Sequence, residues 1–228
     1  MSKRLINTIG TVSIVSSALF SLNVQADTHS PSTQALTASK SQLMAKLAGI
    51  KYFSAQFSQS IYTEEGELIQ QGAGKLAISK PNLVNWQTTS PDETFIISDG
   101  ETLWFYDPFI DQATAYSLAK SIDNTPILLL TNDDISLWQQ YQVNEVAIPK
   151  EQSTQNDVAF VITPKKEDSQ IKSLTVTFNG NAIKSFSFKD ATGQLSQIEL
   201  TQYQQSKVPA EDLFQFTLPE GVRLEDKR

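Results

Sequence analysis

The sequence predicts a mainly β-protein with a few α-helices, built as one antiparallel sheet of about eleven strands that is strongly curved or nearly closed. From Tyr52 onward, short runs of residues alternate between apolar and polar, which is the period of strands with one buried face. Turns of the hairpin type, such as Asp99-Gly100 and Asn179-Gly180, separate successive runs and join neighbouring strands antiparallel. The predicted helices are too few to cover an outer face, so we expect them to plug the open mouth of the sheet.

Residues 1–26 have the layout of a secretory signal peptide. Lys3 and Arg4 precede an apolar run, and Val24-Gln25-Ala26 ends that run with small residues at the offsets of a cleavage site. A membrane anchor is the competing interpretation, but polar residues interrupt the run, and a stable span needs roughly 20 strongly apolar residues. We therefore expect cleavage after Ala26 and a single domain over residues 27–228.

Charge and cysteine content restrict the possible partners and the location. The net charge is −7, and the signal peptide holds two of the 18 basic residues and none of the 25 acidic ones, so the remainder carries −9. Such a surface repels phosphate backbones and anionic head groups, and we expect no nucleic-acid binding. The chain has no cysteine, which excludes disulfides and an N-terminal lipidated cysteine. These features predict an exported periplasmic protein without a lipid anchor.

Helical periodicity appears before the strands and again in the middle of the chain. Over residues 34–49 four apolar residues share one helix face, while Lys40, Gln42 and Lys46 lie mostly toward solvent. The four are Leu36, Leu43, Leu47 and Ile50. In the middle, Asn124 or Thr125 can cap a short helix that begins at Pro126. Asp133 or Asp134 can cap a further helical turn through Trp138.

The strands are expected between turn signals. In the first strand Phe53, Ala55 and Phe57 point to one side, and in the third Val84 and Trp86 share a face. Gly72-Ala73-Gly74 predicts a bend or bulge in the second. The expected strands are 52–62, 67–79, a third opening at Pro81, 95–98, 102–106, 112–118, 141–148, 158–163, 173–179, 182–188 and 194–204, followed by a helical turn at 209–213 and an end segment at 214–218.

The residues needed for common catalytic sites are missing. His29 is the only histidine and there is no cysteine, so Ser-His and Cys-His nucleophiles and His/Cys zinc sites cannot be built. Asp107 and Asp111 could in principle act as a glycosidase pair, but they flank a proline-containing turn, where solvated turn residues are the simpler interpretation. We expect no enzyme, no metal site and no cofactor.

Several segments resemble one family specifically, the LolA outer-membrane lipoprotein carriers. The resemblance covers essentially the whole chain after the signal peptide. The matching segments are Lys80-Pro81-Asn82-Leu83-Val84-Asn85-Trp86, Pro91-Asp92-Glu93, Ile96-Ile97-Ser98-Asp99-Gly100, Leu103-Trp104-Phe105-Tyr106-Asp107-Pro108-Phe109, Gln112-Ala113-Thr114-Ala115, Asn124-Thr125-Pro126, Trp138-Gln139-Gln140-Tyr141 and Pro219-Glu220-Gly221-Val222.

This resemblance implies a half-barrel with a helical lid and a function in lipoprotein transport. A LolA protein is a periplasmic chaperone that accepts acylated lipoproteins from the LolCDE transporter, shelters their acyl chains in an apolar cavity and delivers them to LolB at the outer membrane. LolB shares the fold but is lipidated on a cysteine, so this chain fits the carrier. A monomer is expected. The alternatives are a lipid- or lipoprotein-sensing regulatory module on the same fold, a periplasmic hydrolase and a lipocalin-like binder of small apolar molecules.

A carrier needs an apolar cavity that a removable lid can close. We expect lid residues to fill the mouth and swing out when acyl chains enter, and strand residues to line the sheet side; ordinary core packing is the alternative for each. The lid residues are Leu43, Leu47, Ile127 and Leu130, and the lining residues are Phe53, Phe57, Val84 and Trp86.

Lys80 stands where the resemblance places an arginine that latches the lid through backbone carbonyls. Lysine keeps the charge and three donors but loses the planar five-donor fork. We therefore expect a latch that holds fewer carbonyls and a lid that opens more readily. A solvent-exposed lysine at a strand entrance is the alternative.

Overall fold

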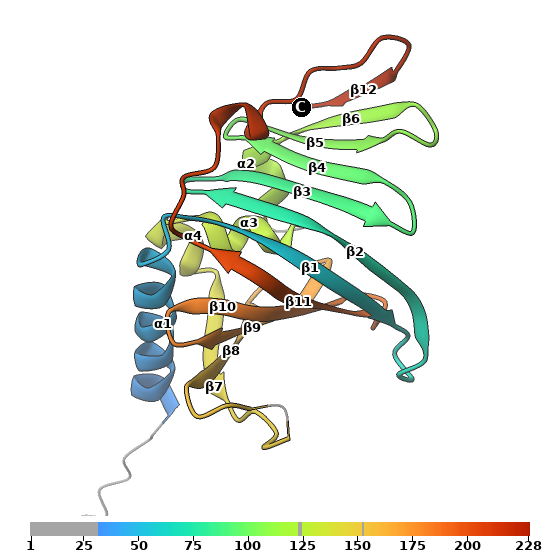
Figure 1. Cartoon of the computed structure of the whole chain (residues 1–228). Helices are drawn as coiled ribbons and strands as arrows, with labels where there is room; N and C mark the ends of the chain where they lie inside the picture. The colour runs from blue at the N-terminus through green and yellow to red at the C-terminus, as the bar shows by residue number, and fades with distance from the viewer. Residues whose placement is uncertain (1–31, 123–124, 152) are drawn as a thin grey trace, which may run out of the picture. The chain divides into compact units, whose positions relative to one another are not determined.

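The computed structural model describes residues 32–122, 125–151 and 153–228, with side chains from Ala38 onward. The predicted signal peptide, His29, the Leu36 side chain and Asn124 lie outside these residues. Within them, 12 strands form one open, curved sheet (Figure 1), which confirms the predicted fold class. The strands are β1 (Tyr52–Tyr62), β2 (Leu68–Ser79), β3 (Leu83–Ser90), β4 (Thr94–Asp99), β5 (Thr102–Asp107), β6 (Gln112–Ser117), β7 (Tyr141–Val146), β8 (Asp157–Pro164), β9 (Ile171–Asn179), β10 (Ala182–Asp190), β11 (Leu195–Gln204) and β12 (Arg223–Lys227).

One helix precedes the strands, and others separate β6 from β7 and β11 from β12. Thr125 precedes α3 but its side chain makes no cap hydrogen bond, whereas the Asp134 carboxylate accepts from the Ser136 backbone N–H at the start of α4. In the described part of the chain no helix has the length and apolar character to cross a membrane. The helices are α1 (Ser32–Ala48), α2 (Leu118–Ser121), α3 (Pro126–Thr131), α4 (Ile135–Trp138) and the short 3-10 helix η2 (Glu211–Phe214).

The strand order explains why the sheet stays open. It runs β12-β6-β5-β4-β3-β2-β1-β11-β10-β9-β8-β7, so β1 pairs with both β2 and β11 and joins two meanders. Strands β12 and β7 remain as edges on opposite sides. Helices α2, α3 and α4 connect β6 to β7 and lie against one face of the curved sheet, while α1 packs along β7 (Figure 1).

Strand register places apolar side chains in continuous rows on the inner face. Direct pairing connects Phe53, Ile78, Val84, Ser98 and Leu103 across five strands. Four of these five are apolar, and all are buried. Because each successive residue alternates faces, the predicted side-chain direction of β1 and β3 holds through this row.

Gly74 is the position where the sheet needs a glycine. The β2–β3 register shifts between Ala73 and Gly74, which confirms the predicted bulge. A Cβ at Gly74 would lie 2.0 Å from the Gln87 carbonyl oxygen and 2.5 Å from the Phe57 ring. The missing side chain therefore gives Phe57 its place on the inner face.

The C-terminal segment contains the expected helical turn, slightly shifted along the chain. The turn was expected at 209–213 and is η2, whose last residue, Phe214, is 1% exposed. The Asn85 Nδ2 donates to the Leu213 carbonyl at 2.5 Å, and the Phe216 ring lies 4.9 Å from that of Trp104. This segment therefore covers the outer face of β3 to β5.

Two further elements were not predicted. Strand β12 pairs with β6 in parallel, so the sheet has one more strand than expected and one parallel pair. Its sequence, Arg223 to Lys227, is mostly charged and lacks alternation, because an edge strand needs only backbone pairing on one side. Leu118 starts α2 where the sequence had suggested the end of β6.

Candidate functional site

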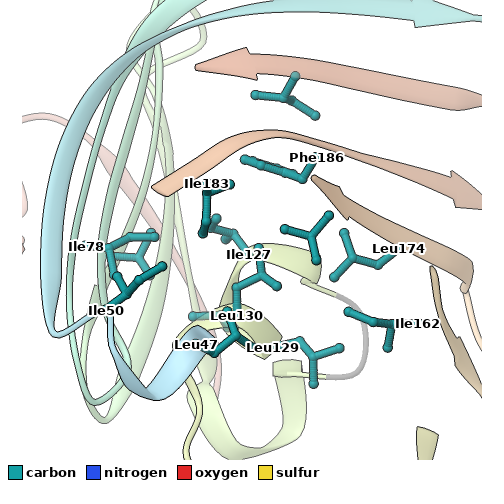
Figure 2. Close-up of a cluster of buried hydrophobic side chains, with 14 of the residues drawn as sticks. Leu47, Ile50, Ile78, Ile127, Leu129, Leu130, Ile162, Leu174, Ile183 and Phe186 are labelled. Carbon is teal, nitrogen blue, oxygen red and sulfur yellow. The ribbon is translucent and has the colours of Figure 1, made fainter. Parts of the chain in front are cut away.

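The interior enclosed by the sheet brings together all eight residues predicted to form a lid and a cavity wall. Each is between 0% and 8% exposed, and all belong to one apolar cluster. Figure 2 shows Leu47, Ile127 and Leu130 pointing into the space bounded by the sheet. The eight are Leu43, Leu47, Phe53, Phe57, Val84, Trp86, Ile127 and Leu130. Their contact with acyl chains stays a prediction.

Helix α3 lies within this interior. Its four consecutive apolar residues, Ile127 to Leu130, are between 0% and 5% exposed. A surface helix buries one stripe, whereas a helix buried all round lies inside a core. Leu43 and Leu47 of α1 close the same cluster from another side. Side chains of α1 and α3 therefore pack into the interior together with those of the strands.

The wall facing these helices is largely aromatic. The rings of Phe57 and Trp86 lie 4.3 Å apart between centroids, and those of Trp86 and Phe186 lie 6.0 Å apart. Phe53 stacks on Tyr203 at 4.8 Å, and burial raises the pKa of Tyr203 to about 12. Among the described residues, no buried side-chain nitrogen or oxygen lacks a hydrogen-bond partner. The lining therefore offers an apolar ligand few unpaired polar groups.

A cavity of about 360 Å³ adjoins this cluster beside α2. A second space, beneath α3, measures about 10 Å³ and holds at most about one water. No residue of α1 lines either space. The sequence analysis had expected Leu43 and Leu47 of α1 to close the cavity. The residues lining the larger cavity are Leu103, Phe105, Tyr116, Ser121, Thr125 and Gln170.

Lys80 connects two separate parts of the lid. Its side chain is 3% exposed, and Nζ donates to the Leu47 carbonyl of α1 at 3.0 Å and to Asp133 Oδ1 at 2.7 Å. Asn132 Nδ2 adds a bond to Asn82 Oδ1 at 3.3 Å. These contacts fit a latch better than an exposed lysine. The resemblance implies a latch that bonds to several backbone carbonyls, whereas Lys80 bonds to one carbonyl and one carboxylate.

A family model described as "Outer membrane lipoprotein carrier protein LolA" matches residues 48–217, which include this wall, the lid helices of the middle segment and Lys80. The chain belongs to the LolA family. A LolA relative from Yersinia enterocolitica, named outer-membrane lipoprotein carrier protein, is 43% identical over 199 residues, covering 86% of this chain and 92% of its own. One of the same name from Aeromonas salmonicida is 37% identical over 198 residues, covering 86% and 93%.

Solved structures with low sequence identity also align with this chain. An uncharacterized conserved protein from Thermus thermophilus aligns over 82% of this chain and 98% of its own, with 10% identity and a TM-score of 0.50. A LolA superfamily protein from Nitrosomonas europaea aligns over 78% and 98%, with 10% identity and a TM-score of 0.45.

Two lysines of α1 tether the lid of this LolA family member in a way that the sequence did not reveal. Lys40 Nζ donates to the Tyr141 carbonyl at 3.0 Å, and Lys46 Nζ donates to the Gly180 carbonyl at 2.8 Å. Both were expected mostly toward solvent, but they are half-buried, whereas Gln42 is exposed. Desolvation, with a smaller effect of nearby Lys165, lowers the pKa of Lys40.

Asp157 is hydrogen-bonded to the turn between β9 and β10, where the Gly180 carbonyl accepts from Lys46. Its side chain is fully buried and accepts from Lys184 Nζ at 2.7 Å and Asn179 Nδ2 at 2.7 Å, as well as from Thr154. These donors, Lys184 first, hold the pKa of Asp157 far below its usual value. No group of three or more His, Cys, Asp or Glu side chains within the described ranges could hold a metal ion.

Proposed function

We propose that this chain is a periplasmic carrier that receives lipoproteins released from the inner membrane by LolCDE, shelters their acyl chains and delivers them to LolB. The observation that carries the proposal is the apolar interior filled by side chains of α1 and α3, with Lys80 holding the lid at its base. Such an interior can take up acyl chains in place of the helix side chains that fill it.

The energetics favour a stopper over a permanent void. Burying an acyl chain from water contributes about 0.8 kcal/mol per CH₂, and three long chains would pass the ceiling of about 18–21 kcal/mol for non-covalent binding. A carrier must instead hold cargo well enough to prevent escape and less well than the acceptor does. Displacing the packed leucines of α1 and α3 lowers the net affinity, because their own burial is lost when cargo enters.

The regulatory-module alternative is not favoured. The relatives named as carriers align with this chain over 92% and 93% of their own length, so the shared region is the carrier itself rather than a domain of a larger sensor. The expected signal peptide over residues 1–26 supports a periplasmic location, and osmotic-shock fractionation of cells that express the chain tests it.

Reconstituted transfer tests the function. Vesicles containing LolCDE and a radiolabelled lipoprotein are incubated with the purified chain and ATP, and the soluble fraction is then mixed with LolB-containing liposomes. We expect the lipoprotein to leave the first vesicles in a one-to-one complex with the chain and to reach LolB. Lipoprotein that stays in the vesicles, with LolCDE active toward an established carrier, contradicts the proposal.

A further inference from the structure

The open pocket of about 360 Å³ beside α2, here called the side pocket, is lined by six described residues, none of which belongs to α1. Leu103 and Phe105 of β5 and Tyr116 of β6 form its floor, and the rings of Phe105 and Tyr116 meet at 86° with 5.6 Å between centroids. Ser121 and Thr125 flank it from the α2–α3 segment. It is therefore bounded by the sheet, by Ser121 at the end of α2 and by Thr125 just before α3.

The chemistry of the side pocket suits an apolar ligand. Leu103 is 1% exposed and the Ser121 hydroxyl donates to the Ser117 carbonyl at 2.8 Å, so that hydroxyl is already paired within its helix. Water needs two to four polar partners in such a space, and this lining offers few. The side pocket is open to the surface, and its volume of about 360 Å³ lies in the range of ligand-binding clefts.

The rim of the side pocket carries a group that can donate hydrogen bonds. Gln170, in the loop between β8 and β9, is exposed, and its carbonyl is fixed by the Ala191 N–H at 2.8 Å. Lys227 of β12 does not line the side pocket; its ammonium lies 5.5 Å from the centroid of the Tyr116 ring and 3.2 Å from Glu225 Oε2. An apolar floor with the Gln170 amide at its edge fits a chain that ends in a carbonyl group.

Strand register connects the side pocket to the predicted cavity wall. Leu103 pairs with Ser98, which pairs with Val84, and Leu103 pairs with Tyr116 on the other side. The floor of the pocket therefore continues the inner row that leads to Val84. A chain in the pocket would lie against the end of this row, next to Ser121 and Thr125.

We propose that the side pocket takes one acyl chain of the cargo through the opening beside Gln170 while α1 stays closed, and that α1 and α3 are displaced only by the chains that follow. This inference rests on the proposed function and adds the order in which the acyl chains enter. The first chain enters an existing space, so it displaces no packed leucine. The later chains must displace the stopper.

Paired substitutions on α2 test the inference. Ser121→Phe fills the side pocket, and Lys120→Phe adds the same side chain at the adjacent exposed position as a control. The probe is undecanoic acid carrying a terminal dansyl group, whose fluorescence rises in apolar surroundings. We expect Ser121→Phe to weaken probe binding about tenfold or more and Lys120→Phe to leave it within about twofold. Ser121→Leu, a smaller filling, provides the same test if Ser121→Phe does not fold by circular dichroism.

Hydrogen exchange locates the bound probe. We expect the probe to protect amides of β5, β6 and α2 without faster exchange in α1, and a tripalmitoylated peptide to speed exchange in α1. Unchanged probe affinity in a folded filled variant, or faster α1 exchange with the single-chain probe, overturns the inference. A wild-type chain that binds the tripalmitoylated peptide but not the probe also overturns it and leaves the carrier function standing; binding of neither contradicts both.

Discussion

Replacing Lys80 by methionine tests whether this side chain latches the lid. Methionine keeps a similar length and apolar stem but removes the ammonium that joins the Leu47 carbonyl to Asp133, at 3.0 and 2.7 Å. These two bonds connect the end of β2 to α1 and to the α3–α4 connection. The variant therefore frees both parts of the lid at one position.

The expected size of the effect follows from the two contacts. A hydrogen bond from a charged donor contributes about 1.5–3 kcal/mol, and an ion pair with a half-exposed partner such as Asp133 contributes about 0–1 kcal/mol. Losing both should weaken lid attachment by about 1.5–4 kcal/mol and raise the open-to-closed ratio about 10- to 900-fold. The free energy of global unfolding should fall less, because methionine removes the desolvation cost of an ammonium that is 3% exposed.

Native-state hydrogen exchange measures this opening. Amides in the last turn of α1 should exchange faster in Lys80→Met, by the same factor as the rise in the open-to-closed ratio. Amides of β1 and β2 should keep their protection. Lys75→Met is the matched control, since Lys75 lies on the same strand and is exposed. A folded Lys80→Met variant whose α1 amides exchange at the wild-type rate would refute the latch.

Three further predictions concern the latch, the wall and the hairpin. Lys80→Arg restores a planar fork that can hold more carbonyls, so lipoprotein release to LolB should slow; release at the wild-type rate counts against the weaker-latch interpretation. Val84→Glu puts a carboxylate at a position that is 0% exposed, so binding of a tripalmitoylated peptide should be lost while far-ultraviolet circular dichroism stays that of a folded sheet; normal binding would remove Val84 from the wall. The folded pKa of Asp157 lies below its unfolded value of about 3.9. Its carboxylate therefore stabilises the fold above that pH, and this contribution is lost as the pH falls below about 4. Urea unfolding from pH 7 to pH 2 should show less loss of stability in Asp157→Asn than in wild type, and equal losses would contradict the assigned role.

Most of the sheet could be predicted because each strand carries its own signal. The first strand was expected at residues 52–62 and is β1, Tyr52–Tyr62, since alternation and flanking turns are local. The buried residues of α3 were equally visible, because Pro126 and four apolar residues stand together. The family resemblance added the half-barrel and the position of Lys80, which alternation alone does not single out.

The features that sequence reasoning missed depend on partners far along the chain. Lys40 and Lys46 bond to carbonyls that are 101 and 134 residues away, and a lysine on a helix carries no mark of such a partner. Strand β12 forms because the edge of β6 is available for pairing, not because of its own mostly charged sequence. The side pocket is space left between elements, which no residue pattern encodes.

Distance measurement between α1 and the sheet tests the exchange of lid side chains for acyl chains most directly. The chain has no cysteine, so Gln42→Cys on α1 and Lys75→Cys on β2, both exposed positions, take spin labels uniquely for pulsed electron paramagnetic resonance. On saturation with a tripalmitoylated peptide, the distance distribution should move to longer values and return when LolB removes the peptide. An unchanged distribution with the peptide bound one to one would contradict the account.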